Sequence, residues 1–359
     1  NYIADASNGN NYFGLPISGH LDYPLKHPQM RVFTSVVRPT AGAEFVSSRH
    51  FPDDVQGNFL VTNVIGFQGI KNHRPLQEGS GVTSQEMPPL LTSRDINFRP
   101  VEMEFGPDGA LYVTDWFNPL IGHMQYSLRD PRRDTTHARS WRSTHKDRPL
   151  LQPVNLAELS TAELLDQLRE YEDRTRYRAR RELRERPWEE VQVALDQWIE
   201  GLDPQDAEYE HHLLEALWVQ QARDRVDAEL LQRLLRADDH RARAAATRTL
   251  RYSQHRVDDP LALMRQQVND PHPLVRLEGV VALSFVRDAR AAEVALEALR
   301  HPTDYYLDYG LRETLRGLES AWKPEVLSGA PFAEDNPQGM IFLLEQLAPE
   351  EVALVHRTP

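Results

Sequence analysis

FGPDGALYVTD, residues 105–115, joins a tight turn to an apolar strand. Its Pro-Asp-Gly turn requires a residue that tolerates positive φ, and Gly109 provides one. A second copy of this pattern is FPDDVQGNFLVTN, residues 51–63. Gly57 then matches Gly109 and Asn63 matches Asp115, an interval of 52 residues. The repeat predicts two strands, at residues 58–64 and 110–114. A polar side chain, Asn63 or Asp115, lies at the end of each strand.

An interval of about 50 residues suits one four-stranded blade of a β-propeller. A fainter copy of the strand exit is Tyr2-Ile3-Ala4-Asp5, so we expect Asp5, Asn63 and Asp115 to occupy equivalent positions. A further strand is expected at residues 30–37. Residues 1–150 supply no more than about three blades, whereas a closed ring needs at least four. We therefore predict a partial β-propeller of two to three blades over residues 1–150.

The pattern becomes helical after Pro153. Ser160 and Glu163 form a capping box that predicts a helix from Thr161. A charged residue then recurs seven positions before a leucine, at spacings of 32 to 34 residues: Arg176 and Leu183, Glu210 and Leu217, Arg243 and Leu250, Arg276 and Leu283, Asp308 and Leu315. Such a period indicates helix pairs whose apolar faces are covered by their neighbours. Two more short helices are expected at residues 339–347 and 350–356.

The best copy of this repeat, DPHPLVRLEGVVAL at residues 270–283, resembles the inner helix of a HEAT repeat. We therefore predict a multidomain chain, β then α, with the C-terminal blades of a β-propeller followed by a HEAT-like α-solenoid over residues 155–359.

Composition narrows the classes of function. The chain has no cysteine, which excludes disulfides, thiolate zinc sites, a cysteine nucleophile and attached c-type haem within these residues. Residues 1–150 carry 15 acidic and 15 basic side chains, so the net charge of −13 arises from the remainder. An acidic solenoid disfavours nucleic acid as a partner. No apolar run approaches the roughly 18 residues that predict a membrane span.

A longer stretch carries a family resemblance. Arg99-Pro100-Val101-Glu102, followed by FGPDGALYVTDWFNPLIGHMQYSLRDPRRDTTHARSWR, resembles the planctomycete-type membrane-bound dehydrogenases. SGHLDYPLKHP, SSRHFPDDVQGNFLVTNVIGFQGIKN and NFRP resemble the same family. The resemblance implies a propeller similar to glucose and sorbosone dehydrogenases, then HEAT repeats, then a c-type cytochrome module. It also implies a periplasmic or secreted protein, of which we expect this chain to be a fragment.

The sequence departs from that family near the end of the second repeat. Ala138 stands where a glycine is expected, and Ser140 and Ser143 occupy places that are usually apolar. We therefore expect a poorly formed strand over residues 139–145. The haem motif of the cytochrome module is absent, so any electron acceptor would lie outside this chain.

The leading candidate site follows the strand that ends at Asp115. Asp115 and Asn118, with the equivalent Asp5, could provide oxygen ligands to calcium. His123 and His20 could act as general bases toward the hydroxyl of a sugar or polyol. The alternative interpretation is structural: Asp115 would cap a turn, His123 would pack between blades, and His20 would only be hydrogen-bonded.

A basic cluster follows this site and comprises Arg129, Arg132, Arg133, Arg139, Arg142, Lys146 and Arg148. Arg129 and Arg133, with Trp116, could hold pyrroloquinoline quinone, because the carboxylates of that cofactor suit guanidinium groups. Pairing with the interleaved Asp130 and Asp134 is the alternative.

Two functions follow from these patterns. The first is part of a quinoprotein-like sugar or polyol dehydrogenase, with calcium and pyrroloquinoline quinone on the propeller. Its solenoid would dock a protein partner, while the remaining blades and a cytochrome c module would lie elsewhere in the parent protein. The second is a non-catalytic scaffold in which propeller and solenoid bind protein or glycan.

Overall fold

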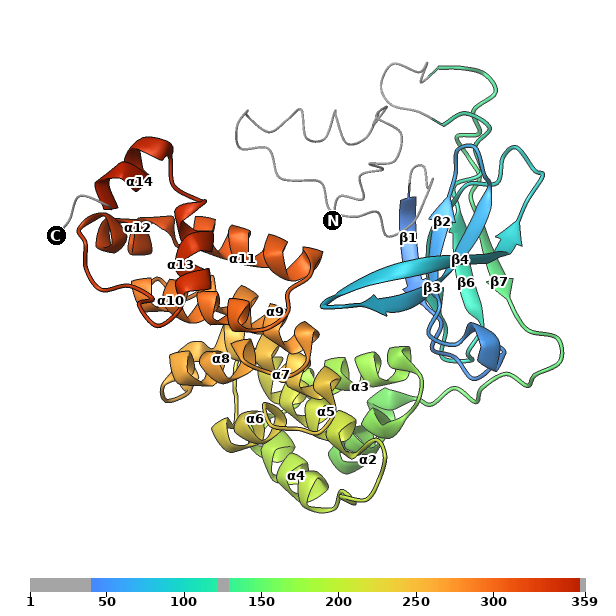
Figure 1. The fold of residues 1–359 in the computed structure, drawn as a ribbon. Helices are drawn as coiled ribbons and strands as arrows, with labels where there is room; N and C mark the ends of the chain where they lie inside the picture. The colour runs from blue at the N-terminus through green and yellow to red at the C-terminus, as the bar shows by residue number, and fades with distance from the viewer. Residues whose placement is uncertain (1–39, 122–128, 356–359) are drawn as a thin grey trace. The chain divides into compact units, whose positions relative to one another are not determined.

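The computed structural model describes residues 40–121 and 129–355 of the chain (Figure 1). The predicted strand at residues 30–37 and the strand exit at Asp5 lie outside the described residues. The chain divides into two compact units. The first comprises residues 1–77, 82–158 and 169–179, and the second comprises residues 78–81, 159–168 and 180–359.

The first sheet has four strands in chain order: β1 (Thr40–Phe45), β2 (Phe59–Asn63), β3 (Gly69–Glu78) and β4 (Gly81–Thr92). β2 is antiparallel to β1 and to β3, and Phe59 lies opposite His73 in the β2–β3 register. A short 3₁₀ helix, Asp53–Val55, lies in the β1–β2 connection. The strand predicted at residues 58–64 is confirmed as β2, and its residues Leu60, Val61 and Thr62 are all buried.

The second sheet has three strands: β5 (Pro100–Phe105), β6 (Leu111–Asp115) and β7 (Arg139–Ser143). Phe105 pairs with Leu111 across the Pro-Asp-Gly turn, and Gly109 has the positive φ (78°) that the sequence predicts. The strand predicted at residues 110–114 is confirmed as β6. Its inward residues Leu111 and Val113 are fully buried, while Tyr112 between them is exposed.

The expectation of a poorly formed strand after Ala138 is wrong. β7 pairs with β6 along its whole length, from Asp115 opposite Arg139 to Leu111 opposite Ser143. Buried apolar side chains do not hold this edge strand, since Trp141 is 43% exposed. Side-chain hydrogen bonds to β6 and its turn do so instead: Arg139 and Trp141 donate to Asp115, and Arg142 donates to Asp108.

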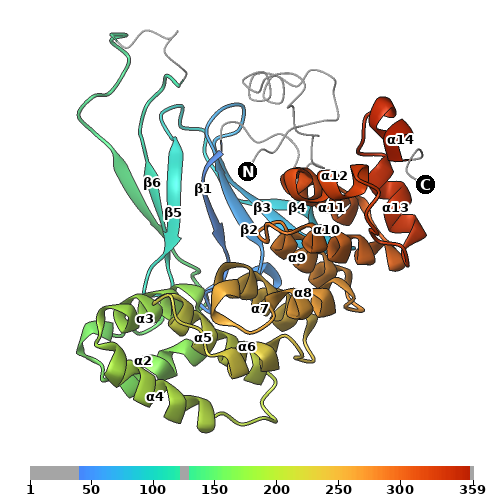
Figure 2. The same cartoon turned by 90° about the vertical axis from the view of Figure 1, so that its left-hand side faces the viewer.

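The two sheets share one hydrophobic core. Figure 2 shows β5 and β6 beside β1, and the two sheets contact one another through β5, which packs against β1 and β2. This core consists of Val46, Phe51, Leu60, Ile70, Met103, Phe105, Leu111 and Val113. The described strands thus form two separate antiparallel sheets, neither of which closes into a barrel. Packing of the two sheets against one another removes the apolar side chains of this core from water.

We expect the sheet unit to lose stability in mild acid through His73, whose side chain is fully buried on β3. Burial lowers the pKa of His73, with Glu86 raising it and Lys71 lowering it further. Because the folded-state pKa lies below the ordinary value, the unfolded chain binds more protons as the pH falls past about 6.5. The urea midpoint of the sheet unit should therefore fall between pH 7.5 and 5.

The matched control for this titration is His73→Gln, which keeps a polar side chain of similar length but does not titrate. Its urea midpoint should fall less steeply over the same pH interval. Equal slopes for the two proteins would show that other groups, and not His73, are responsible for the acid sensitivity.

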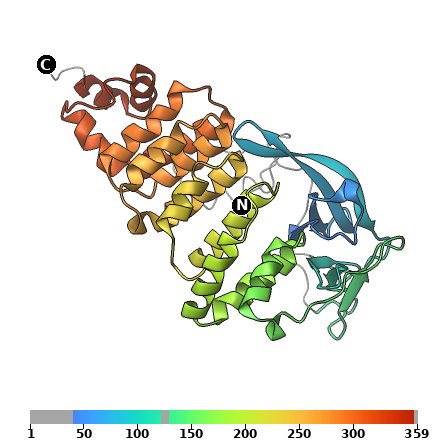
Figure 3. The ribbon, with the colours of Figure 1, turned by 90° about the horizontal axis from the view of Figure 1, so that it is seen from below.

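The helical unit begins as the sequence predicts. Helix α2 (Thr161–Asp166) starts at Thr161, and the Ser160 side chain and Glu163 form the reciprocal capping box. Helix pairs then follow one another as a row (Figures 1 and 3). The first helices of the pairs are α3 (Asp173–Glu185), α5 (Tyr209–Gln221), α7 (His240–Ser253), α9 (Pro273–Leu283) and α11 (Tyr305–Gly317). The helix that follows each of them is α4 (Trp188–Glu200), which packs against α2, and then α6 (Ala228–Leu234), α8 (Pro260–Val268), α10 (Ala289–Leu296) and α12 (Glu319–Leu327).

The leucine period of the sequence matches this row. Each leucine of the period lies on the first helix of a pair, and each is at most 1% exposed: Leu183, Leu217, Leu250, Leu283 and Leu315. Helix α9 packs against α7 on one side and against α11 on the other. A helix pair therefore covers its apolar face with the neighbouring pairs, as in an α-solenoid.

The charged position of the period has a structural role that the sequence did not reveal. Arg276 donates from Nη1 to the carbonyl oxygens of Asp270 and Pro271, at 2.9 and 3.0 Å, and from Nη2 to that of Pro302, at 2.9 Å. Arg243 makes the same pair of bonds, to Ala237 and Asp238. These carbonyls lie in loops where no helical partner is available, so the guanidinium groups satisfy them.

Two short α-helices follow α12, and several 3₁₀ helices lie between the longer elements. Helices α13 (Pro337–Leu344) and α14 (Pro349–Val355) confirm the two short helices expected near the end. Further 3₁₀ helices comprise Leu156–Glu158, Gln167–Arg169, Gln254–Arg256 and Glu297–Arg300. Among the described residues, no helix has both the length and the apolar character that crossing a membrane requires.

Candidate functional site

Asp115, the predicted calcium ligand, ends strand β6 and is 1% exposed. Its Oδ1 accepts hydrogen bonds from the backbone N–H groups of Arg99, at 2.8 Å, and Phe117, at 2.9 Å. Its Oδ2 accepts from Arg139 Nε, at 2.7 Å, and Trp141 Nε1, at 3.0 Å. Both oxygens are thus held by groups of the same sheet unit. The carboxylate fixes the strand exit, as the structural interpretation of the sequence expected.

Asn118, the second predicted ligand, is buried three residues further on. Its Oδ1 accepts from the Leu120 backbone N–H at 3.1 Å, and its Nδ2 donates to the Asp134 carbonyl at 3.4 Å. Arg133 reaches the same loop and donates from Nη1 to the Leu120 carbonyl at 3.3 Å. The structure therefore brings Asp115, Asn118 and Arg133 into one region, where each has partners within the protein.

The basic cluster is largely paired with carboxylates. Arg132 contacts Asp130 at 2.8 Å, Arg142 contacts Asp108 at 2.5 Å and Arg148 contacts Asp53 at 2.9 Å. The alternative interpretation, pairing between arginine and aspartate, thus describes these members. Trp116 and Arg129 are exposed. A cofactor-binding role for Trp116, Arg129 and Arg133 stays a prediction.

The predicted bases and the third predicted metal ligand cannot be placed. His20, His123 and Asp5 lie outside the described residues. Within the described ranges, no group of three or more histidine, aspartate or glutamate side chains is arranged to hold a metal ion. The calcium site therefore stays a prediction as well.

Arg99 is the residue of this region whose importance the sequence reasoning missed. Its side chain is buried just before β5, and its donors reach carbonyl oxygens on two loops. Nε donates to Asn118 at 2.9 Å, Nη1 donates to Val64 at 3.1 Å and more weakly to Phe98 at 3.4 Å, and Nη2 donates to Pro119 at 3.0 Å. Arg99 belongs to the NFRP stretch, but no local pattern marks an arginine whose partners lie up to 35 residues away.

The charge of Arg99 is not neutralised by direct contact. Among the described residues, no carboxylate forms an ion pair with its guanidinium. Burial lowers the pKa of Arg99 from its ordinary value, while the more distant charges of Asp115 and Asp95 raise it. An arginine stays protonated in proteins at any physiological pH. This part of the sheet unit therefore contains a buried positive charge that is solvated by carbonyl dipoles.

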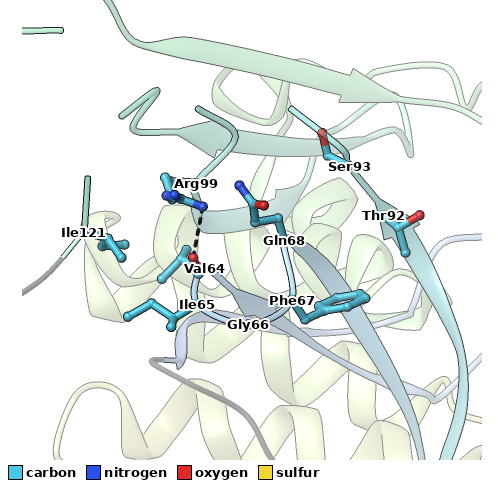
Figure 4. A pocket seen from close by; sticks show the side chains of 9 residues that line it. All are labelled: Val64, Ile65, Gly66, Phe67, Gln68, Thr92, Ser93, Arg99 and Ile121. Atoms are coloured by element: carbon cyan, nitrogen blue, oxygen red, sulfur yellow. Dashed lines mark hydrogen bonds between the residues drawn. The ribbon is translucent and has the colours of Figure 1, made fainter. Parts of the chain in front are cut away.

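A pocket of about 430 Å³ opens beside this charge (Figure 4). The loop between β2 and β3 forms one wall and contributes Val64, Ile65, Gly66, Phe67 and Gln68. Thr92 at the end of β4 and Ser93 directly after it lie on a second side, and Arg99 and Ile121 complete the lining. Asn63 shapes the first wall, because its Nδ2 donates to the carbonyl oxygens of Ile65 and Phe67. Asn63 and Asp115 thus both organise the loops after their strands, as their equivalent positions predict.

The lining combines two kinds of surface. Val64, Ile65, Phe67 and Ile121 are apolar, whereas Arg99, Gln68, Thr92 and Ser93 carry polar groups. Gln68 is itself held in place, since its Nε2 donates to the carbonyls of Asp95 and Phe98 at 2.9 and 3.2 Å. Concave sites with an apolar lining and a few fixed polar groups are typical of small-molecule binding.

Comparison with known proteins assigns each unit separately. Residues 15–147 match the family described as a domain of unknown function, DUF7133. Residues 226–316 match the family described as HEAT repeats. No curated protein matches the chain. Neither match is to a dehydrogenase family; the sheet unit is similar to a domain of unknown function, and the helical unit is similar to HEAT repeats.

Proposed function

We propose that this chain is a non-catalytic binding scaffold, in which a HEAT-like solenoid docks a protein partner. The observation that carries the proposal is a cluster at the C-terminal ends of α7 and α9, in which the half-buried Arg251 contacts two exposed rings, those of Tyr252 and Phe285. Tyr252 is 54% exposed near the end of α7, and Phe285 is 48% exposed just after α9. Their rings lie 5.8 Å apart at an interplanar angle of 73°. Arg251 covers both rings, at 4.6 and 5.4 Å from the two centroids.

Tyrosine and arginine are among the residue types that contribute most binding energy at protein interfaces. Here they are held in place before a partner arrives, because the guanidinium stacks on both rings. A preformed aromatic surface loses less side-chain entropy on binding. The preformed aromatic surface, together with the match to HEAT repeats, supports protein docking on the solenoid.

The proposal includes the finer architecture of the sheet unit. The two sheets would be neighbouring blades of a β-propeller whose other blades lie outside the described residues. The shared core of the two sheets supports this, as do the equivalent roles of Asn63 and Asp115 at their strand ends. A glycan or a protein would then bind the loop face of the propeller.

A double variant tests the docking surface. Tyr252→Ser with Phe285→Ser removes both exposed rings, while Val193→Ser removes an apolar side chain that is 59% exposed on α4. We expect the unchanged chain and Val193→Ser to capture the same partner from an extract of the native source, and the double variant to lose it. Capture of an identical set of proteins by all three would contradict docking at this surface.

The second candidate function is a quinoprotein-like sugar or polyol dehydrogenase in the periplasm or a secreted state. Its supporting observation is the position of the Arg99 pocket, because Ile121, two residues before His123, lines it. His123 would act as the base, and the electron acceptor would be a haem carried by another module. Calcium and pyrroloquinoline quinone would be bound by the loop face of the sheet unit.

Calcium and dye reduction separate the two functions. The dehydrogenase requires that calcium and pyrroloquinoline quinone raise the melting temperature of the chain and that a sugar or polyol then reduces an electron-accepting dye. The scaffold requires neither effect. A dye-reducing activity that is abolished by His123→Ala would reject the non-catalytic proposal, whereas failure of every substrate in a sugar panel would reject the dehydrogenase.

A further inference from the structure

The pocket beside Arg99 contains a positive charge with unused hydrogen-bonding capacity. A guanidinium has five N–H groups, and four of those of Arg99 donate to carbonyl oxygens. The fifth, on Nη2, has no acceptor among the described residues. Arg99 is only 8% exposed, yet it lines the pocket. A buried cation whose direct partners are carbonyl dipoles, with the carboxylates of Asp115 and Asp95 further away, still attracts an anion that enters beside it.

We propose that this pocket binds a small organic anion whose carboxylate contacts Arg99 and whose apolar body lies against Ile65, Phe67 and Ile121. This inference goes beyond the proposed function, since it holds whether the chain is a scaffold or an enzyme. The charge of Arg99 selects an anion over a sugar or a metal cation. The apolar wall favours a carboxylate that carries a hydrocarbon group over inorganic phosphate or sulfate.

Different walls of the pocket would contact the carboxylate and the apolar body of such a ligand. In Figure 4 the side chains of Arg99 and Gln68 lie close together, with Ile65 and Ile121 on one side and Phe67 on another. The Gln68 amide is fixed by its bonds to the Asp95 and Phe98 carbonyls, so the polar end of the pocket is rigid before binding. Ile65 is 44% exposed, which leaves apolar area that a ligand would cover.

Benzoate and benzamide form a suitable probe pair, because they share an aromatic body and differ in charge. Both are titrated into the complete chain by isothermal calorimetry or by protein-observed NMR. We expect benzoate to bind about tenfold more tightly than benzamide, and added salt to weaken benzoate alone. Equal affinities for the two compounds, or no binding of benzoate at about 10 mM, would overturn the inference.

A charge placed on the pocket wall provides the matched control. Arg99 itself is a poor choice for substitution, because its side chain also joins the loops through their carbonyls. Ile65→Asp and Ile65→Asn have nearly the same shape but differ by one negative charge. We expect Ile65→Asp to weaken benzoate binding about tenfold relative to Ile65→Asn and to leave benzamide unchanged. Equal benzoate affinities for the two variants would show that benzoate binds somewhere else.

Discussion

Asp115→Ala should open the second sheet and lower its free energy of unfolding by about 3–5 kcal/mol, which is typical of removing one partner from a buried charge pair. Asp115 is buried and accepts four hydrogen bonds from β7 and from the chain on either side of the β5–β6 hairpin. Removing the carboxylate orphans two backbone N–H groups and the indole N–H. Among the residues that the structure describes, Arg139 would retain only the exposed Asp95 as a carboxylate partner.

Asp115→Asn should recover only part of this loss. Its amide oxygen can still accept from the Arg99 and Phe117 N–H groups, but its NH₂ would then face two further donors, on Arg139 and Trp141. Hydrogen exchange of the β6 and β7 amides measures the free energy of local opening directly.

Asp130→Ala is the control for this series, because Asp130 contacts the exposed Arg132 on the same loop. It should leave the exchange rates of β6 and β7 unchanged. Protection of β6 and β7 that stays unchanged in Asp115→Ala, together with loss of calcium binding, would show that Asp115 serves a metal and not the sheet.

Arg276→Ala should destabilise the solenoid by about 2–4 kcal/mol, because three carbonyl groups lose a charged donor at once. Arg276 is 4% exposed, and its donors reach the loop before its own helix and the loop before the next pair. The loss should therefore appear as reduced amide protection at the starts of both α9 and α11. Urea unfolding followed by far-UV circular dichroism measures the total effect.

Two variants separate the hydrogen bonds of Arg276 from its bulk and its charge. Arg276→Met keeps an unbranched apolar stem but no donor, so it should lose nearly as much as Arg276→Ala. Arg241→Ala removes an arginine whose side chain is 78% exposed and that pairs with Asp239, and it should cost less than about 0.5 kcal/mol. Equal losses from Arg241→Ala and Arg276→Ala would mean that net charge, not the carbonyl bonds, determines stability.

The candidate site was only partly visible in the sequence. Asp115 was singled out because it ends a repeated strand, and the structure places it at that strand end. Its four donors could not be predicted, since Arg139 and Trp141 are 24 and 26 residues away along the chain. Arg99 was overlooked for the same reason: its acceptors belong to loops that become neighbours only when the two sheets pack together. The His123 and His20 hypotheses lie outside the described residues and stay predictions.

Local patterns determined the secondary structure of this protein. The Pro-Asp-Gly turn set the β5–β6 hairpin, the capping box set the start of α2, and the leucine period set the row of helix pairs, because turn conformation, capping and helical periodicity act over a few residues. Tertiary structure alone decided the functions of the charged residues. Arg99, Asp115 and Arg276 carry charges whose burial depends on partners distant in sequence, and only the folded chain provides those partners.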